Sequence, residues 1–374
     1  MRVGLDLLFL VPGETGGRET YARELVRGLA AERPDLELTA LVNRETAAAG
    51  AGFWSEGAKV VEVGSSGVAR GSWALGELWR LPRAARGLDV LHSVANFGPL
   101  HGGGPARVLT VHDVLWRKLP QTVPTALRLG TNALVTGAAR RAARVITVSQ
   151  ASAADIGAEL GLPAGRVDVV PNGVTPPPAQ PPAPADVGQG ERPLALSVAS
   201  DLPHKNLAAL VDGLAALAPE ERPVLAFAGH GTDTGGLAAR AAECGLTGDV
   251  RLLGAVDPER LEALYAAAAL VATPTRFEGF GLPVLEAMAR RVPVACSDLP
   301  VLREVAGEAA VFFDPGEPAA VAAAIRTALR DADRLRTAGR ERAARFSWAA
   351  AARATAEVYE RAARSPSRPA KASR

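Results

Sequence analysis

The chain has 374 residues, a length that at roughly 150 residues per domain predicts two domains. Its 42 Lys and Arg against 40 Asp and Glu give a net charge of +2, which argues against a nucleic-acid-binding protein. Two distant cysteines and five scattered histidines form neither a disulfide framework nor a zinc motif. The longest apolar run, 263–272, is about half the ~20 residues of a membrane span, and no signal-peptide pattern is present. We therefore expect a cytoplasmic protein.

Short apolar runs alternate with helical stretches along the first half of the chain. Helical spacing is clearest over 19–31 and 125–143. This alternation is typical of a parallel sheet that helices cover on both faces. The expected strands are 2–10, 36–42, 59–63, 89–93, 107–113, 144–149 and 166–171.

A proline-rich stretch, 174–193, interrupts the pattern, and seven prolines make it unsuitable for helix or sheet interior. The alternation then resumes, which predicts a second α/β domain. Residues 316–346 and 348–361 are expected to be helical. The expected strands of the second domain are 194–200, 223–229, 249–254, 269–274, 292–297 and 309–314.

Two similar α/β domains joined by a linker predict parallel sheets whose carboxyl ends face a ligand-binding cleft. We expect an N-terminal and a C-terminal Rossmann-like domain. The boundaries are 1–173 for the first domain, 174–193 for the linker, 194–347 for the second domain, 348–363 for a final helix and 364–374 for a disordered tail.

Three loops that follow strands carry candidate binding groups. Gly16 and Gly17 open a helix, where backbone N–H groups suit a phosphate, or they form an ordinary turn. His112 follows a strand and can contact a sugar hydroxyl or cap the turn; His92 is a weaker candidate. Lys205 lies near a helix start, where an ammonium can clamp a diphosphate, in a chain with only four lysines.

The stretch 274–294, PTRFEGFGLPVLEAMARRVPV, is the most specific in the chain. Glu278 and Glu286 are separated by seven residues, with Gly279 and Gly281 in the loop between them. Pro283 fits the first turn of a helix, which places Glu278 in the loop and Glu286 about one turn inside the helix. Two carboxylates beside a helix N-terminus can accept bonds from hydroxyls while the N–H groups bind an anion.

These motifs together resemble glycosyltransferase family 4, and the resemblance covers nearly the whole chain. It implies the GT-B fold, two Rossmann-like domains facing across a cleft. The N-terminal domain would bind the acceptor, the C-terminal domain would bind the nucleotide sugar, and the final helix, 348–363, would cross back to the N-terminal domain. The resemblance also implies sugar transfer from a nucleotide-diphosphate donor with retention of configuration and without a metal or other cofactor. The motifs are the GG-x-x-x-Y of 16–21, VSQASAADI at 148–156, VVPNGV at 169–174, the P-H-K-N segment at 203–206 and E-x7-E at 278–286.

The resemblance also assigns roles to residues. His112, Lys205 and Glu278 would act at the reacting centre, with Lys205 on the donor diphosphate and Glu278 by the donor sugar. Glu286 would bind the ribose. The remaining donor contacts would come from Gly16, Gly17, Ser200, Gly254, Val256, Gly279, Phe280, Gly281 and Leu282.

The chain departs from the family at two positions. Ser200 and His204 stand where many members have arginine, so one fixed charge is missing from the diphosphate clamp and Arg18 is a candidate replacement. A small hydroxyl residue at position 200 resembles bacterial members that use mannose or deoxysugar donors. The Asp331–Asp333 pair lies in an Arg-rich helical stretch and is interpreted as surface, not as a metal site.

Other interpretations stay open at this point. A sugar-nucleotide epimerase, a phosphorylase and a catalytically silent sugar-nucleotide-binding protein share this fold. The stretch 72–88, with Trp73, Trp79 and three arginines, is either a core-packed helix with a wet basic face or a peripheral contact to the inner membrane face. The acceptor is a glycan, a lipid-linked sugar or a small natural product.

Overall fold

The computed structural model describes residues 1–50, 57–101, 104–163, 165–180, 182–183, 187 and 192–364. The chain divides into two compact units. The N-terminal unit comprises Met1–Gly173 and the segment from Ser347 onward, and the C-terminal unit comprises Val174–Phe346. Of the predicted linker, residues 174–180 form neither helix nor strand; 181, 184–186 and 188–191 lie outside the described residues, as do 365–374 of the predicted tail.

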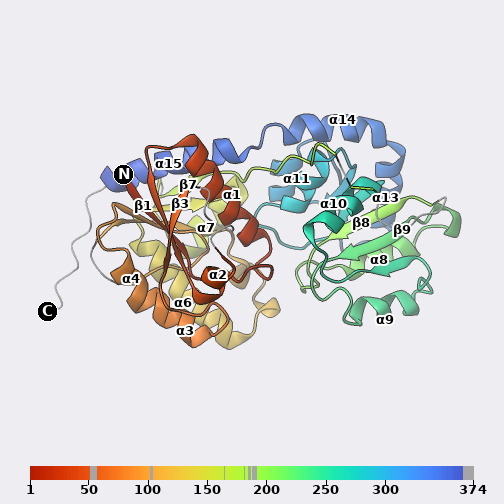
Figure 1. Cartoon of the computed structure of the whole chain (residues 1–374). Helices are drawn as coiled ribbons and strands as arrows, with labels where there is room; N and C mark the ends of the chain where they lie inside the picture. Colours follow the sequence, from red (N-terminus) through yellow and green to blue (C-terminus); the bar gives the residue numbers. More distant parts are fainter. Residues whose placement is uncertain are drawn as a thin grey trace. The chain divides into compact units, whose positions relative to one another are not determined.

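The N-terminal unit is built on a parallel sheet of seven strands in the order β3-β2-β1-β4-β5-β6-β7 (Figure 1). All seven strands lie within or beside the predicted apolar runs. They are β1 Arg2–Leu7, β2 Glu37–Val42, β3 Ala58–Glu62, β4 Val90–Ser93, β5 Ala106–Thr110, β6 Arg144–Thr147 and β7 Val167–Val169. The α-helices of the first 173 residues are α1 Gly17–Glu32, α2 Arg44–Ala48, α3 Arg70–Leu75, α4 Leu81–Ala84, α5 Leu115–Lys118, α6 Thr125–Arg141 and α7 Gln150–Leu160.

The stretch predicted as one helix over 72–88 is interrupted. A π-helical turn, η2 Gly76–Arg80, joins α3 to α4, and a short 3-10 turn, η3 Pro120–Thr122, precedes α6. Gly76 lies so close to the loop after β3 that a Cβ there would be 2.6 Å from the Ser65 Cβ. The wider turn accommodates this close approach of the backbone to the loop.

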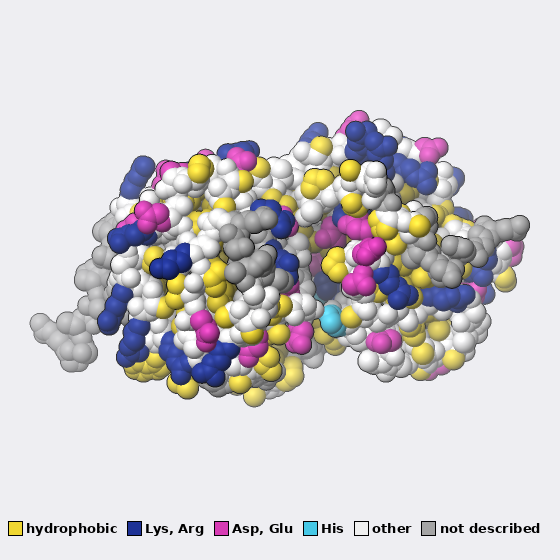
Figure 2. All heavy atoms as spheres, in the orientation of Figure 1, with side chains coloured by type: hydrophobic (Ala, Val, Ile, Leu, Met, Phe, Trp, Pro, Cys, Tyr) yellow, Lys and Arg dark blue, Asp and Glu magenta, His cyan; other side chains and the backbone are white. Residues whose placement is uncertain are grey.

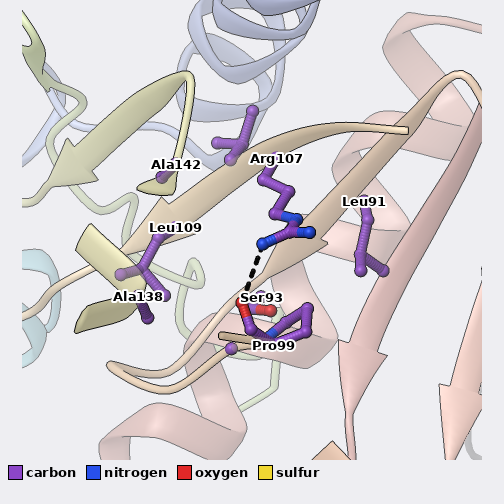
Figure 3. Close-up of a pocket in the computed structure, with 9 residues that line it drawn as sticks. Leu91, Ser93, Pro99, Arg107, Leu109, Ala138 and Ala142 are labelled. Atoms are coloured by element: carbon purple, nitrogen blue, oxygen red, sulfur yellow. Dashed lines mark hydrogen bonds between the residues drawn. The ribbon is translucent and has the colours of Figure 1, made fainter. Parts of the chain in front are cut away.

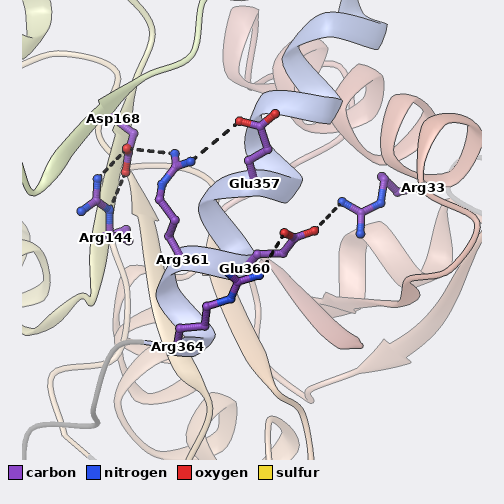
Figure 4. A network of polar contacts seen from close by, with 7 residues as sticks. All are labelled: Arg33, Arg144, Asp168, Glu357, Glu360, Arg361 and Arg364. Carbon is purple, nitrogen blue, oxygen red and sulfur yellow. Dashed lines mark hydrogen bonds and ion pairs between the residues drawn. The ribbon is translucent and has the colours of Figure 1, made fainter.

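The last helix, α15 Trp348–Arg364, belongs to the N-terminal unit although it ends the described chain. It lies beside α1, and Tyr359 and Trp348 are buried by the unit (Figure 1). Ion pairs fix its outer turns, among them Arg361 to Asp168 at 3.1 Å and Arg33 to Glu360 at 3.0 Å (Figure 4).

The C-terminal unit has a six-stranded parallel sheet in the order β10-β9-β8-β11-β12-β13. The strands are β8 Leu194–Val198, β9 Val224–Ala228, β10 Val250–Leu252, β11 Leu270–Thr273, β12 Val294–Ser297 and β13 Val311–Phe313. The helices are α8 Ala208–Ala215, η4 Pro219–Glu221, α9 Gly236–Glu243, α10 Pro258–Ala267, α11 Leu282–Ala289, α12 Pro300–Ala306, α13 Pro318–Arg330 and α14 Ala332–Ala343. A core cluster packs one face of this sheet against α8, α9 and α13 through residues such as Leu210, Phe227 and Ile325.

Both sheets are entirely parallel, as predicted from the alternation of short strands and helices. In such sheets the loops that follow the strands gather at one edge, so each unit has one edge suited to ligand binding. Among the described residues, no helix is long and apolar enough to cross a membrane.

Candidate functional site

The loops after the strands of the C-terminal unit hold most of the predicted donor-binding residues. Ser200 and Lys205 follow β8, Gly254 and Val256 follow β10, and Glu278 follows β11. Because all of these strands are parallel, the residues lie at the same edge of the sheet.

Lys205 and Glu278 form an ion pair at this edge. Lys205 Nζ donates to Glu278 Oε1 at 2.5 Å, and the two side chains are only 21% and 12% exposed. The loops that carry them are joined by the main chain, since the Arg276 N–H donates to the His204 carbonyl at 2.8 Å. A lysine ammonium has three N–H donors, so two remain for another oxygen ligand after this bond is made.

The segment Gly279–Leu282 leads into α11. Gly279, Phe280 and Gly281 are buried, and Leu282 is half-buried as the first helical residue. Gly281 has a left-handed φ of 100°, and a Cβ there would lie 2.6 Å from Leu302 Cδ2, so glycine is required by both conformation and space. This tight turn directs the first N–H groups of α11 toward the edge of the sheet.

Glu286 lies in the second turn of α11 and is half-buried. The buried hydroxyl of Tyr265 donates to Glu286 Oε2 at 3.0 Å. Burial raises the pKa of the Glu286 carboxyl above its usual range, although the Tyr265 hydroxyl favours the charged form. Arg290 lies over the Tyr265 ring at 5.0 Å and donates to Glu262 at 2.8 Å, which fixes the tyrosine from its other side.

Ser200 and Gly254 are connected through Gly229, a residue that the sequence did not single out. The Gly229 N–H donates to the Gly254 carbonyl at 2.7 Å. Gly229 has a φ of 151°, and a Cβ there would lie 2.1 Å from the Ala199 carbonyl oxygen, next to Ser200. The backbones of the loops after β8, β9 and β10 are thus in contact, and Val256, two residues after Gly254, is half-buried.

In the N-terminal unit, His112 follows β5 and is held at two points. Its Nε2 lies 3.0 Å from the Val94 carbonyl, which requires a proton on Nε2, and its backbone N–H donates to Asn96 Oδ1 at 2.9 Å. The Tyr21 ring meets the imidazole edge-on at 4.8 Å. Burial lowers the pKa of His112 to about 4, so at neutral pH the imidazole is uncharged and Nδ1 is an acceptor.

Gly16 and Gly17 are exposed at the N-terminus of α1. Gly16 is the N-cap residue, with φ 60° and ψ −138°, and no atom lies within 4 Å of a Cβ built there. The neighbouring Arg18 lies 5.9 Å from the Phe9 ring, and burial lowers the pKa of its guanidinium. The structure therefore puts a cation beside these glycines.

A buried hydrogen-bonded chain behind His112 was not predicted from the sequence. His92 Nδ1 lies 2.8 Å from the Tyr359 hydroxyl, and His92 Nε2 lies 2.7 Å from Thr110 Oγ1. Thr110 Oγ1 lies 3.0 Å from the Tyr21 hydroxyl. The strand position of His92 was the only sequence signal, since its partners come from α1, β5 and α15.

The structure thus forms two groups, each within its own unit. Lys205, Glu278 and Glu286 lie with the glycine loops in the C-terminal unit, and His112 lies in the N-terminal unit with Gly16 and Gly17. Within the described ranges, no three His, Cys, Asp or Glu side chains are grouped as a metal would require. Asp331 bonds Arg330 at 2.7 Å on the surface, as the sequence indicated.

Two hollows of the N-terminal unit are lined by none of the predicted site residues. One of about 10 Å³ lies between strands β4 and β5 and helix α6, next to Arg107, whose Nη1 donates to the Pro99 carbonyl at 3.0 Å (Figure 3). An open groove of about 310 Å³ is lined by Trp116, Arg117, Pro120, Arg128, Leu129, Asn132 and Glu159.

Two family models match the chain, one in each half. Residues 15–176 match the model described as Glycosyltransferase Family 4, and residues 184–346 match Glycosyl transferases group 1. O-antigen chain mannosyltransferase B of Escherichia coli is 36% identical over 44% of this chain and 45% of its own length. MMP α-(1→4)-mannosyltransferase of Mycolicibacterium hassiacum is 32% identical over 60% of this chain and 55% of its own length. The chain therefore matches about half the length of these relatives.

Solved structures match over nearly the whole chain. Sucrose-phosphate synthase of Thermosynechococcus elongatus has a TM-score of 0.74 at 20% identity, covering 96% of this chain and 98% of that one. HepE of Anabaena, in complex with UDP and glucose, has a TM-score of 0.72 at 20% identity, covering 96% and 99%. These likenesses, with the two parallel sheets, confirm the predicted α/β GT-B fold.

Proposed function

We propose that this chain, which matches the Glycosyltransferase Family 4 model in its first half and the Glycosyl transferases group 1 model in its second, is a retaining glycosyltransferase using a nucleotide-diphosphate-sugar donor. The observation that carries the proposal is the Lys205–Glu278 pair at the sheet edge that also holds the start of α11. These groups suit a sugar diphosphate. The cation and the helix N-terminus can bind its phosphates, and the carboxylate can accept hydrogen bonds from its hydroxyls.

Each group has a role in this proposal. The two remaining Lys205 donors and the first N–H groups of α11 bind the diphosphate. Glu278 holds Lys205 in place and accepts a hydrogen bond from a hydroxyl of the donor sugar. Glu286, oriented by Tyr265, accepts hydrogen bonds from the ribose hydroxyls. The loops at Ser200, Gly254 and Val256 line the rest of the donor.

We propose that His112, in the N-terminal unit, contacts the donor sugar. Because its Nε2–H is directed to the Val94 carbonyl, its Nδ1 can accept a hydrogen bond from a donor-sugar hydroxyl. A neutral imidazole also avoids placing a second positive charge by a sugar whose anomeric carbon becomes electron-poor. Gly16 and Gly17, with Arg18 beside them, supply further N–H groups and charge for phosphate.

The proposed step exchanges one bond for another on the same face of the sugar. The acceptor oxygen bonds the anomeric carbon as the bond from that carbon to the diphosphate oxygen breaks. The diphosphate leaves with the electron pair and takes the acceptor's proton. The protein's contribution is positioning and stabilisation of the leaving charge by Lys205 and α11, and we expect activity to persist in EDTA.

The comparisons favour particular donors. The two relatives above are mannosyltransferases, and HepE has been solved with UDP, so mannosyl donors and uridine nucleotides are the first to test. We propose that the acceptor is bound by loops of the N-terminal unit and is a glycan, a lipid-linked sugar or a small natural product.

The test is a thermal-shift screen of the full chain with UDP-, GDP- and dTDP-sugars, followed by turnover assays on acceptor pools. One donor class should raise the unfolding temperature. Lys205→Ala should lower turnover about a hundredfold or more, because the leaving diphosphate loses its cation. Asp331→Ala is the matched control, since its surface ion pair with Arg330 is remote from the site and should leave turnover unchanged.

Full activity of Lys205→Ala would refute the assigned role, and equal stabilisation of the variant and the parent by the donor would refute the diphosphate contact. Free nucleotide released without any acceptor would favour an epimerase. Turnover that requires inorganic phosphate would favour a phosphorylase.

A further inference from the structure

Large hydrophobic side chains left exposed are concentrated in one part of the N-terminal unit. Among the described residues only six such side chains are exposed, and five come from residues 68–129. Leu75 and Trp79 are 56% and 53% exposed, and Leu129 is 62% exposed. The sixth, Leu202, is in the C-terminal unit. The other two members of the group are Val68 and Leu127.

Four of these residues, Leu75, Trp79, Leu127 and Leu129, belong to helices on the same face of the sheet, and Val68 precedes α3. Parallel register pairs Leu91 with Arg107 and Ser93 with Leu109, so these four side chains lie on one face. Leu91 packs in the same cluster as Leu81 of α4, and the small cavity places Leu91 and Leu109 together under α6 (Figure 3). The α3–α4 segment and α6 therefore cover the same face.

The loop between β4 and β5 connects the two helical segments. The Phe97 ring lies 4.8 Å from the Trp73 ring of α3, and the His101 ring lies 4.9 Å from the Trp79 ring of η2. On its other side this loop reaches α6, because a Cβ on Gly137 would be 3.0 Å from Leu100 Cδ2. Leu75 and Trp79 thus lie on one side of this loop, and α6 with its exposed Leu127 and Leu129 lies on the other.

This part of the chain is strongly basic. Residues 63–154 contain eleven Lys or Arg and three Asp or Glu, whereas the rest of the chain has an acidic excess. One of the three acids, Glu77, is buried and faces away from solvent. In Figure 2, Lys and Arg side chains lie among hydrophobic ones on the lower side of this unit, near the position of α3 in Figure 1.

The cationic and apolar side chains are also adjacent to one another. The Arg83 guanidinium lies 6.0 Å from the Trp79 ring centre and donates to the Trp79 carbonyl at 2.7 Å. Arg80 and Arg86 are exposed on the same helical segment. A tryptophan with arginines around it is suited to the boundary between lipid headgroups and acyl chains.

We propose that this surface docks the protein on a membrane with anionic lipids. The basic apolar surface consists of Val68, Leu75, Trp79, Arg80, Arg83, Arg86, Leu127 and Leu129. Trp79 and the leucines enter the headgroup region, while the arginines bind lipid phosphates. This docking is independent of the proposed donor chemistry, and it would bring the N-terminal unit to acceptors carried on a lipid.

The test is co-sedimentation of the full chain with vesicles of phosphatidylcholine alone or mixed equally with phosphatidylglycerol. Binding should require phosphatidylglycerol and be lost near 1 M salt, where the Debye length is about 3 Å. Arg80→Gln with Arg86→Gln should weaken binding about 25-fold, since each cation near the surface is worth roughly fivefold. Trp79→Ser with Leu129→Ser should weaken it about tenfold or more.

Matched controls come from the C-terminal unit. Leu202→Ser removes an exposed leucine of the C-terminal unit, and Arg336→Gln with Arg340→Gln removes two exposed charges. Both should bind vesicles as the parent does. The proposal is overturned if the parent does not bind anionic vesicles, if the controls weaken binding as much, or if capture by nucleic acid exceeds vesicle binding at equal salt. Unchanged donor thermal shifts in the surface variants show that they remain folded.

Discussion

The family resemblance assigned Lys205 and Glu278 to the same reacting centre, but it did not predict the ion pair between them. The position of each residue could be predicted, because the end of a strand and the start of a helix both leave local patterns in the sequence. Their contact spans 73 residues of chain and depends on how β8 and β11 pair in the sheet. Contacts of this kind have no periodicity and could not be predicted. The same holds for Tyr265, which reaches Glu286 from a different helix.

His112 makes a pH-dependent contribution to stability whose sign follows from its low pKa. In the folded chain the pKa is about 4, against about 6.5 for the unfolded chain. Between these values the unfolded chain binds a proton that the folded chain does not, so the free energy of unfolding falls as pH drops. From pH 7 to 4.5 this loss should be about 2 kcal/mol.

The measurement compares the parent with His112→Gln, which retains a donor for the Val94 carbonyl. All five tryptophans belong to the N-terminal unit, so urea unfolding followed by tryptophan fluorescence reports on this unit. The pH dependence of the variant should be shallower by about 2 kcal/mol. Asp6, whose pKa burial raises to about 6, acts with the opposite sign but is common to both proteins. Identical slopes would show that His112 is protonated at its ordinary pKa.

At the scale of elements, the strands were the most predictable part of the fold. Each observed strand coincides with a short apolar run, because a strand buried on both faces needs continuous apolar residues. The π turn at Gly76–Arg80 was not predicted, since the local pattern over 72–88 is that of a regular helix. Its cause is tertiary: the close approach of Gly76 to Ser65 and the burial of Glu77.

Gly229 should be the most sensitive glycine in the loops of the C-terminal unit. In Gly229→Ala the new Cβ meets the Ala199 carbonyl, which is backbone and cannot move aside. We expect a loss of about 2 kcal/mol or more in the free energy of unfolding, and weaker donor binding as the loop at Ser200 shifts.

The control for this substitution is Gly245→Ala. Gly245 also has a positive φ, 69°, but no atom lies within 4 Å of its Cβ position. The Gly245→Ala variant should lose only about 1 kcal/mol in the free energy of unfolding, from backbone strain, and should bind the donor normally. Circular dichroism melts and donor titration of both variants check this. Equal effects would mean that φ alone, rather than the contact with Ala199, controls the loop.

At the scale of the whole molecule, the two units differ in how the chain builds them. The C-terminal unit is one continuous segment, whereas the N-terminal unit combines residues from both sides of it. Fragment 174–346 should therefore fold alone. Fragment 1–173 should not, because it lacks the buried Trp348 and Tyr359 of α15. Joining 347–364 to 1–173 through a flexible linker should restore cooperative unfolding.

Urea titrations of the three fragments, followed by circular dichroism, make this comparison. A cooperative transition for 1–173 alone, at the same urea concentration as the linked fragment, would contradict the structural role assigned to α15. Tyr359→Phe, made both in the linked fragment and in the full chain, then measures how much the hydrogen bond to His92 contributes to the free energy of unfolding.

The position of α15 also sets an order for synthesis. As the chain leaves the ribosome, residues 174–346 emerge after most of the N-terminal unit and before the helix that completes it. The second unit can therefore reach its native state while the first still has an uncovered face, the one that α15 will occupy beside α1. The emergence of α15, not the emergence of the first 173 residues, is then the event that allows the first unit to become native.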